Sequence, residues 1–263
     1  MKYSHDVIVI GGGAAGLTAA GGCALFGLKV ALIEAGAMGG ECLNNGCVPS
    51  KALIAAAARA AEARTGSRLG VTLAPPEVDW AGVHAHVHGA IAAIAPHDSQ
   101  ERFEGWGCEV IRAYARLIGP HTVEVAGRQL SAPRIVLATG AAPAIPDLPG
   151  LAAVPFLTNE TLFELGELPG HLLVLGGGVV AMEMAQAFCR LGSAVTVIAP
   201  GALMARDDPE SVALAKATME AEGVRFVTGR AEAASGGPGA IRLALAGGAI
   251  AEGTHLLVAT GRR

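Results

Sequence analysis

Two glycine-rich segments, 165 residues apart, constrain the fold of this chain more than any other feature. The first follows residues 6–10, a run of β-branched residues that is typical of a fully buried parallel strand. It has the pattern G-x-G-x-x-G. Gly11 permits a tight turn, Gly13 lets a pyrophosphate approach the backbone, and Gly16 lets a helix pack on the strand. The segment therefore predicts a strand, a phosphate-binding turn and a helix.

The residues after this segment strengthen the prediction of a nucleotide site. We expect a helix over residues 14–26, ended by Gly27, and then a strand over residues 29–33 that ends in Glu34. An acid at this place can accept hydrogen bonds from an adenosine ribose. A lone glycine pattern is common in turns, but strand, glycines, helix, strand and acid in this order favour a dinucleotide site. The expected binding residues include Ala14 and Ala15.

The second half of the chain repeats the first without gaps. Residues 172–181 align on residues 7–16, and the strand that follows the helix recurs at residues 195–198. Two such segments in one chain predict two nucleotide sites and therefore two bound nucleotides. The expected binding residues of the second site are Gly176, Gly178, Val179, Val180 and Ala181.

Two substitutions distinguish the second copy from the first. Ala181 replaces the third glycine, which is an allowed variant of the pattern and widens the spacing between helix and strand slightly. Ala199 stands where Glu34 ends the second strand of the first copy. Without an acid nothing repels a 2′-phosphate, so we expect NADPH to be preferred or at least accepted. Arg206, a little further along the chain, is the candidate to receive that phosphate.

Two further segments complete the prediction of the fold. Residues 134–140 give another buried strand that ends in Ala-Thr-Gly, and residues 257–261 repeat it. Residues 141–150 hold three prolines and predict a linker. The sequence thus predicts an α/β fold with two Rossmann-like nucleotide-binding domains, each with a central parallel sheet, at residues 1–150 and 151–263.

Two cysteines, Cys42 and Cys47, follow the first nucleotide site in a segment rich in Gly and Asn. The Ala-rich run at residues 52–63 predicts a helix, and Pro49 suits its first turn. A thiol at a helix start is favoured as thiolate, and two thiols within reach can form a redox-active disulfide. Two buried structural cysteines are the simpler interpretation of an arbitrary pair at this spacing. The neighbouring dinucleotide pattern favours the redox interpretation.

Residues 39–51, from Gly-Gly-Glu-Cys to Cys-Val-Pro-Ser-Lys, resemble the active-site disulfide segment of the flavin-dependent pyridine nucleotide–disulfide oxidoreductases. The resemblance implies FAD in the first site and NAD(P)H in the second. It implies that Cys42 is the more exposed thiol and exchanges with substrate, whereas Cys47 lies against the flavin. It also implies that Lys51 lies near the flavin ring and pairs with Glu183. The family pattern adds nucleotide-binding residues at Gly40, Thr139, Gly140 and Gly261.

The resemblance also implies an enzyme. A hydride passes from NAD(P)H to FAD, and the electrons reach the Cys42–Cys47 disulfide and then a small-molecule or metal-ion substrate. Residues 179–181, 185–188 and 206–209 are most similar to mercuric reductases. Dihydrolipoyl dehydrogenase is the alternative within the family, and a non-catalytic nucleotide-binding or redox-sensing module is the alternative of another class.

Family members continue past the segment that matches residues 257–261, with a dimerisation domain that carries a His–Glu pair. We therefore expect this chain to be a fragment that lacks the dimerisation domain, and the full-length form to be a homodimer.

Charge and hydropathy exclude several other functions. A net charge of −4 and a pI near 6.1 give no electrostatic reason to expect binding to nucleic acid or to an anionic membrane. Residues 7–28 are uncharged and long enough to span a bilayer. Seven glycines interrupt them, however, and no basic segment of a signal peptide precedes them. We expect a soluble, cytoplasmic protein.

A second apolar segment, residues 78–103, is expected to form one helix that carries three histidines. His84 and His88 share a face at helical spacing and could hold a metal ion, whereas His86 points elsewhere. Because the sequence places no carboxylate or thiol beside them, a solvated helix face is the preferred interpretation, and no metal site is expected.

Overall fold

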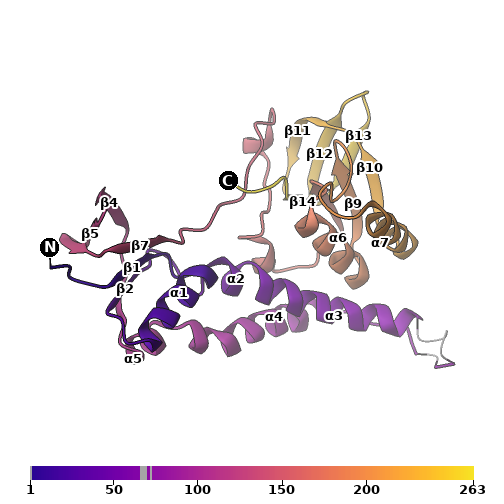
Figure 1. The fold of residues 1–263 in the computed structure, drawn as a ribbon. Coiled ribbons are helices and arrows are strands. Elements are labelled where there is room, and N and C mark those ends of the chain that lie inside the picture. Colours follow the sequence, from indigo (N-terminus) through magenta and orange to yellow (C-terminus); the bar gives the residue numbers. More distant parts are fainter. Residues whose placement is uncertain (1, 66–69, 72) are drawn as a thin grey trace. The chain divides into compact units, whose positions relative to one another are not determined.

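The computed structural model describes residues 2–65, 70, 71 and 73–263 (Figure 1). The chain forms two compact units. The first unit contains Met1–Pro49 and His88–Ala141, and the second contains Ser50–Val87 and Ala142–Arg263. The second boundary lies at the start of the predicted linker. The expected domains at residues 1–150 and 151–263 stay a prediction, because residues 50–87 group here with the second unit.

The first unit is built around a parallel sheet of four strands in the order β3-β2-β1-β7. Along the chain its strands are β1 (Val7–Ile10), β2 (Val30–Ile33), β3 (Glu109–Ile111) and β7 (Arg134–Leu137). Side chains alternate between the two faces of a strand. Val7 and Val9 of the central strand accordingly pack with helix α1 (Ala14–Leu25), and Ile8 faces the opposite side. The uncharged run at residues 7–28 is therefore a buried strand followed by a helix.

An antiparallel sheet supplies the side chains that cover the face of Ile8. Its strands, in the order β4-β5-β6, are β4 (Ala115–Gly119), β5 (Thr122–Val125) and β6 (Arg128–Ser131). Val123, Val125 and Leu130 of this sheet are buried in one cluster with Ile8. The middle strand, β5, alternates between buried and more exposed residues, as a sheet with one covered face requires.

The prediction of a single helix over residues 78–103 is wrong. Helix α4 (Trp80–Ile94) is followed by a short 3-10 helix, η2 (Ala95–Asp98), and by helix α5 (Gln100–Gly105). Pro96 lacks the backbone N–H that an α-helix needs at that place. Ser99 then begins the new helix, because its Oγ accepts a hydrogen bond from the backbone N–H of Arg102.

Two helices come between β2 and α4. The short helix α2 (Gly40–Asn44) carries Cys42, and α3 (Cys47–Thr65) begins at the second cysteine. The predicted helix is therefore confirmed, with Pro49 in its first turn, but it begins five residues before the Ala-rich run. Neither α3 nor any other helix within the described residues is long and apolar enough to cross a membrane.

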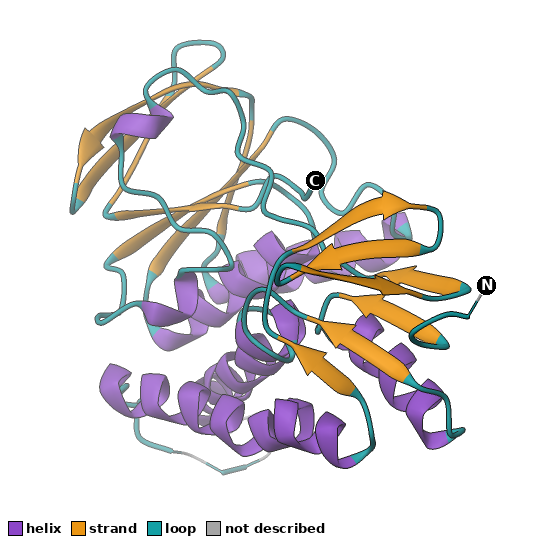
Figure 2. Ribbon diagram, turned by 90° about the vertical axis from the view of Figure 1, so that its left-hand side faces the viewer, coloured by secondary structure: helices purple, strands orange, loops and turns teal. Residues whose placement is uncertain are grey.

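The second unit has a parallel sheet of the same topology, in the order β10-β9-β8-β14. Its elements along the chain are η3 (Leu151–Ala153), η4 (Leu162–Glu164), β8 (His171–Leu175), α6 (Val179–Leu191), β9 (Ala194–Ala199), α7 (Pro209–Glu222), β10 (Arg225–Thr228), β11 (Ala231–Gly237), β12 (Ala240–Leu245), β13 (Ile250–Gly253) and β14 (His255–Val258). Strands β11-β12-β13 form an antiparallel sheet (Figure 2). The predicted class, α/β with a central parallel sheet in each repeat, is confirmed.

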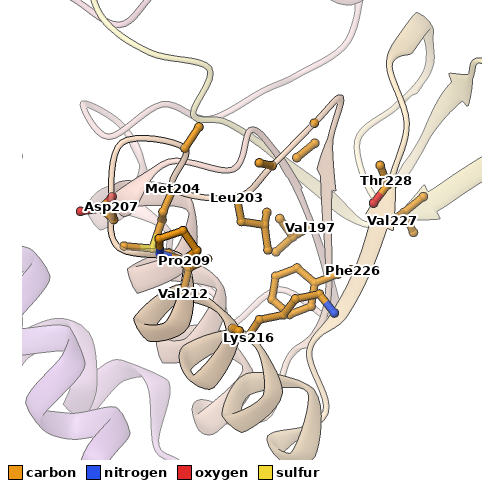
Figure 3. A pocket seen from close by; sticks show the side chains of 15 residues that line it. Val197, Leu203, Met204, Asp207, Pro209, Val212, Lys216, Phe226, Val227 and Thr228 are labelled. Atoms are coloured by element: carbon orange, nitrogen blue, oxygen red, sulfur yellow. The ribbon is translucent and has the colours of Figure 1, made fainter.

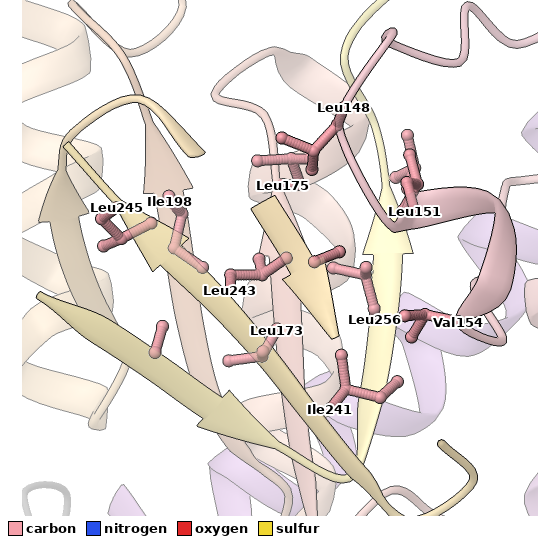
Figure 4. Close-up of a cluster of buried hydrophobic side chains, with 13 residues drawn as sticks. Leu148, Leu151, Val154, Leu173, Leu175, Ile198, Ile241, Leu243, Leu245 and Leu256 are labelled. Atoms are coloured by element: carbon pink, nitrogen blue, oxygen red, sulfur yellow. The ribbon is translucent and has the colours of Figure 1, made fainter. Parts of the chain in front are cut away.

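The core of the second unit lies between its two sheets (Figure 4). Leu173 of β8, Leu243 of β12 and Leu256 of β14 are fully buried there. Leu148, in the predicted linker, and Leu151, just after it, pack against one side of this cluster. The cluster holds β8 firmly, so that its carboxyl end presents the second glycine-rich segment at the edge of the sheet.

Candidate functional site

The first glycine-rich loop adopts the geometry that the sequence predicts. Gly11 has a φ of +112°, and a Cβ there would lie 2.1 Å from the carbonyl oxygen of Ala138. A Cβ on Gly16 would lie 1.8 Å from the carbonyl oxygen of Gly11, so helix α1 packs against the turn at a distance that only glycine allows. Gly13 is the N-cap of α1 and has no side chain to satisfy the first backbone N–H groups of the helix.

These features make the loop suitable for the pyrophosphate of a dinucleotide. A Cβ built on Gly13 meets only the Cα of Gly40 within 4 Å, so a phosphate can approach the backbone. The first turn of α1, which includes Ala14 and Ala15, contains no acidic residue. Uncapped N–H groups and the positive end of the helix dipole favour an anion at this place.

The acid at the end of β2 has partners that the sequence did not reveal. Glu34 accepts hydrogen bonds from the backbone N–H groups of Gly12 and Gly36, each at 2.5 Å. Its carboxylate therefore lies across the glycine-rich loop, beside the place where an adenosine ribose is expected. The loop thus binds one carboxylate of the chain itself with two backbone donors.

The segment with the cysteines packs directly on this loop. The backbone N–H of Gly39 donates to the carbonyl oxygen of Gly12 at 2.9 Å, and Gly39 forms a parallel bridge with Gly13. Gly40 has a φ of +57°, and a Cβ on it would lie 2.5 Å from the Cα of Gly13. These contacts fix the start of α2 against the phosphate-binding turn. Cys42 lies two residues after Gly40, the residue that makes the closest of them.

Cys42 and Cys47 form an interacting pair of thiols. No disulfide is present among the five cysteines, all of which are described. Burial, a hydrogen bond with Cys47 and the charges of Cys47 and Asp98 raise the pKa of Cys42 to about 11. Cys42 therefore keeps its proton in the reduced pair. Cys42 is half-buried whereas Cys47, the first residue of α3, is exposed, so the expectation that Cys42 is the more exposed thiol is wrong for this structure.

Lys51 lies one turn after Cys47 on α3. Its Nζ is 2.5 Å from Oε1 of Glu183 on α6, so the predicted ion pair is present within the second unit. The side chain of Lys51 is 60% exposed and that of Glu183 is 34% exposed. An ion pair with this exposure contributes at most about 1 kcal/mol to stability.

The second glycine-rich loop repeats the backbone of the first. Gly176 has a φ of +130°, and a Cβ there would lie 2.2 Å from the carbonyl oxygen of Ala259, as Gly11 does with Ala138. Gly178 is the uncapped start of α6, and a Cβ on it would meet nothing within 4 Å. Val179 and Val180, which follow, are exposed, whereas Ala181 is fully buried against the sheet.

A cavity of about 490 Å³ lies beside this loop, at the carboxyl ends of β8 and β14. Leu175, Gly176, Pro200 and Thr260 line it, as expected for a nucleotide site at this edge of a parallel sheet. Three charged residues that the sequence interpretation missed also line it: Asp147, Arg230 and Glu232. Asp147 comes from the predicted linker, Arg230 immediately precedes β11, and Glu232 lies in β11. No local sequence pattern identifies them.

The remaining predicted binding residues lie at the ends of the strands next to β1 and β8. Thr139 and Gly140 follow β7, and the backbone nitrogen of Thr139 is 3.2 Å from a Cβ built on Gly11. Gly261 follows β14 with a φ of +125°, and its carbonyl oxygen accepts a hydrogen bond from Ala144. The histidines of α4 differ in exposure: His84 and His88 are partly buried, and His86 is exposed.

Two α/β repeats, each with an open glycine-rich loop at the carboxyl edge of a parallel sheet, define a protein that binds two dinucleotides. A cysteine pair lies in the segment that packs on the first of these loops. Residues 5–263 match the family model described as pyridine nucleotide-disulphide oxidoreductase. The chain belongs to this family, as its sequence predicted.

Individual relatives agree with this assignment. The chain is 35% identical to mercuric reductase of Bacillus cereus over 269 residues, which cover 100% of this chain and 42% of that protein. It is 38% identical to dihydrolipoyl dehydrogenase 3 of Pseudomonas aeruginosa over 285 residues, which cover 100% of this chain and 59% of that protein.

A solved structure has the same fold. The HOCl-induced flavoprotein disulfide reductase RclA from Escherichia coli superposes with a TM-score of 0.84 at 27% identity. The match covers 98% of this chain and 57% of RclA. The chain therefore spans about half the length of the relatives it matches.

Proposed function

We propose that this chain is the nucleotide-binding and redox part of an FAD-dependent disulfide reductase that takes electrons from NAD(P)H. The observation that supports the proposal is the contact of Gly39 and Gly40 with the first glycine-rich loop, because Cys42 follows two residues later. A pair of structural cysteines needs no such position. FAD is assigned to the first loop and NAD(P)H to the second, as in the family. Bound FAD supplies the two-electron transfer between the nicotinamide and the disulfide.

The residues of the chain have separate functions in this scheme. When two electrons and one proton reach the oxidised pair, the bond between Cys42 and Cys47 breaks, which leaves Cys42 as a thiol and Cys47 as a thiolate in this scheme. Cys47, at the positive end of α3, is the sulfur assigned to the flavin side. Cys42 is the sulfur assigned to the substrate. It attacks as the thiolate, so its proton, held by a pKa raised to about 11, must first pass to a base or to water. The Lys51–Glu183 pair holds the lysine ammonium in one position near the flavin.

The proposed substrate is Hg(II) or a small disulfide, both of which react with thiols. Mercuric reductases and a dihydrolipoyl dehydrogenase are similar to this chain to a comparable degree, and so both substrate classes remain within the proposal. In the second case the electron flow is reversed, from a dithiol to a nicotinamide. The full-length protein is proposed to work as a homodimer, as the family does.

The coenzyme proposed for the second loop is NADPH. Ala199 ends β9 where the first copy has Glu34, so no carboxylate from this position opposes a 2′-phosphate. Arg230, which lines the cavity beside the loop, is a cation that can approach the nucleotide, although Asp147 and Glu232 line the same cavity.

Substitution of each cysteine tests the proposal. In the FAD-loaded chain, Cys42→Ala leaves the Cys47 thiolate against oxidised FAD. We expect a long-wavelength absorption band and no disulfide. Cys47→Ala loses both the band and the disulfide. Because Cys47 is exposed in this structure, alkylation without FAD modifies Cys47 first, and added FAD protects it. Identical behaviour of the two variants, or no FAD uptake, contradicts the proposal.

A further inference from the structure

Three side chains that can bind a metal ion come together beside helix α4. Within the described residues, His84 and His88 of α4 and Glu164 of η4 place one ligand atom each within 4.8 Å of one another. Both histidines are half-buried, and Glu164 is exposed. The sequence places no carboxylate beside these histidines, but the fold supplies one from a segment far along the chain. The reason for preferring a solvated helix face is therefore removed.

Helical spacing sets the two histidines on one face of α4. His84 and His88 are four residues apart, so their side chains lie one turn apart on the same face. The boundary between the two units falls inside α4, just after Val87. Because α4 is one continuous helix over Trp80–Ile94, the position of His88 relative to His84 follows from the helix itself.

Contacts within the second unit place Glu164 beside His84. Trp80, one turn before His84, donates its indole N–H to the carbonyl oxygen of Leu165 at 2.9 Å. Leu165 is the residue after Glu164. The ring of Trp80 also packs on that of Phe188 in α6, with the ring centroids 5.7 Å apart. The start of α4 is thus fixed against the end of η4.

The short helix η4, which carries the carboxylate, is itself held in place. Leu162 and Phe163 of this helix are buried. The backbone N–H of Glu164 donates to the carbonyl oxygen of Thr161 at 3.2 Å. The ligand atoms therefore come from two elements that are already ordered. Such preorganisation favours binding, because little conformational entropy is lost when a ligand enters.

The three donor groups suit a divalent transition metal. Two imidazole nitrogens and one carboxylate oxygen are ligands of Zn(II) and of its neighbours in the first row, at about 2.0–2.2 Å from the ion. Ligand atoms at that distance from one ion are about 3–4 Å apart. Small rotations of the three side chains are sufficient to reach this arrangement from the present separations of at most 4.8 Å. Three protein ligands leave a further position for water or another ligand.

The charged residues beside a cavity of the second unit differ from this cluster. The cavity, of about 380 Å³, lies beside α7, and Asp207 and Lys216 line it among mainly apolar side chains such as Leu203 and Phe226 (Figure 3). One carboxylate and one ammonium group in apolar surroundings suit an organic ligand and not a metal ion. Asp207 is therefore a suitable control carboxylate for a metal-binding experiment.

We propose that His84, His88 and Glu164 bind one divalent transition-metal ion, with Zn(II) as the reference case. The ion bridges α4 and η4 and stabilises the folded chain, because the three ligands are brought together only when the chain is folded. None of these residues belongs to the glycine-rich loops or to the cysteine pair. The inference is therefore independent of the proposed function and is tested without FAD or NADPH.

Titration of the full chain with Zn(II), in a form without a histidine tag, tests the inference. Cys42→Ser and Cys47→Ser are combined in this parent chain, because thiolates also bind Zn(II). We expect calorimetry to show saturable binding of one ion. His88→Ala and Glu164→Gln should each weaken this binding at least about 10-fold, since even the loss of a residue that only orients a metal ligand weakens binding about 10–100-fold.

Two matched controls separate the site from general binding to histidines and carboxylates. His86→Ala removes an exposed histidine of the same helix, and Asp207→Asn removes a carboxylate of the same unit. Both should bind Zn(II) as tightly as the parent chain. If either control weakens binding as much as its partner variant, or if no saturable binding is found, the inference is wrong. Undiminished affinity in Glu164→Gln also overturns it, because the histidines alone then bind the ion.

Co(II), which replaces Zn(II) in such sites, reports which atoms bind the ion. We expect visible d–d absorption bands without the near-ultraviolet band of a cobalt–thiolate bond, and we expect these bands to disappear in His84→Ala. Circular dichroism of each variant separates loss of the site from loss of the fold, and substitution of the exposed Glu164 disturbs packing least. A thiolate band, or d–d bands that persist in a folded His84→Ala chain, assigns the ion to another site and overturns the inference.

Discussion

The two glycine-rich loops of this chain use the same backbone and differ in the side chains laid over it. In the first, Glu34 occupies two backbone donors, glycine stands at the tight helix contact and Gly39 takes the left-handed conformation. In the second, the corresponding residues are Ala199, Ala181 and Met204. The backbone turns and hydrogen bonds of a dinucleotide site are therefore retained in the second loop despite these three substitutions. The substituted side chains then determine which nucleotide each loop accepts.

Substitution of the residue at the contact between helix and loop, Gly16 or Ala181, should have the largest effect on the stability of a unit. Gly16→Ala places a Cβ 1.8 Å from the carbonyl oxygen of Gly11, so α1 must move away from β1. We expect a loss of about 2–3 kcal/mol in the stability of the first unit, typical of overpacking. The converse change, Ala181→Gly, should cost only about 1 kcal/mol, because α6 already has room for a methyl group. Hydrogen exchange by mass spectrometry measures both units separately. Equal effects of the two variants would show that the loops pack alike.

Removal of the Glu34 carboxylate should have the next largest effect. Glu34→Ala leaves Gly12 N–H and Gly36 N–H without their acceptor, and charge-assisted hydrogen bonds of this kind contribute about 1–3 kcal/mol. We expect faster amide exchange at both glycines and weaker FAD binding. Glu34→Gln, which keeps one acceptor oxygen, is the matched control. Its amide exchange and FAD affinity should lie between those of the unmodified chain and those of Glu34→Ala. Unchanged exchange at both glycines would mean that the carboxylate does not hold the loop.

We expect the smallest effect on stability from substitution of Met204, which has the left-handed backbone conformation in the second loop. Met204 has a φ of +42°, a conformation that is unfavourable for residues with a Cβ, whereas Gly39 at the same place has +84°. Met204→Gly should therefore stabilise the second unit by about 1 kcal/mol, measured as slower exchange in β8 and β9. Met204→Ala retains the strained backbone and serves as the control. A destabilised Met204→Gly variant would show that the methionine side chain matters more than the backbone.

Much of this architecture is predictable because it repeats. The offset of 165 residues locates both loops, their strands and the alanines at positions 181 and 199 from the sequence alone. The ion pair between Lys51 and Glu183 was predicted only through the family resemblance, since 132 residues separate the two side chains.

Other features depend on contacts that no local pattern records. Hydrogen bonds from Gly12 and Gly36 to Glu34 require the three-dimensional loop, and so does the approach of Leu203 to Gly177. The exposure of Cys42 and Cys47 was predicted in the wrong order, because the segment from Gly39 folds against the first loop and half-buries Cys42. Charged residues of the second cavity, such as Arg230, come from outside the repeated pattern.

The central claim is that Cys42 and Cys47 are a redox pair coupled to the nucleotide of the first loop. An anaerobic titration of the oxidised, FAD-loaded chain with dithionite tests it most directly, because it counts electrons without requiring a physiological substrate. The account predicts an uptake of about four electrons per flavin, two for the disulfide and two for FAD, and about two in Cys42→Ser. An uptake of about two electrons in both proteins, with no Cys42–Cys47 disulfide in the oxidised chain, would contradict the account.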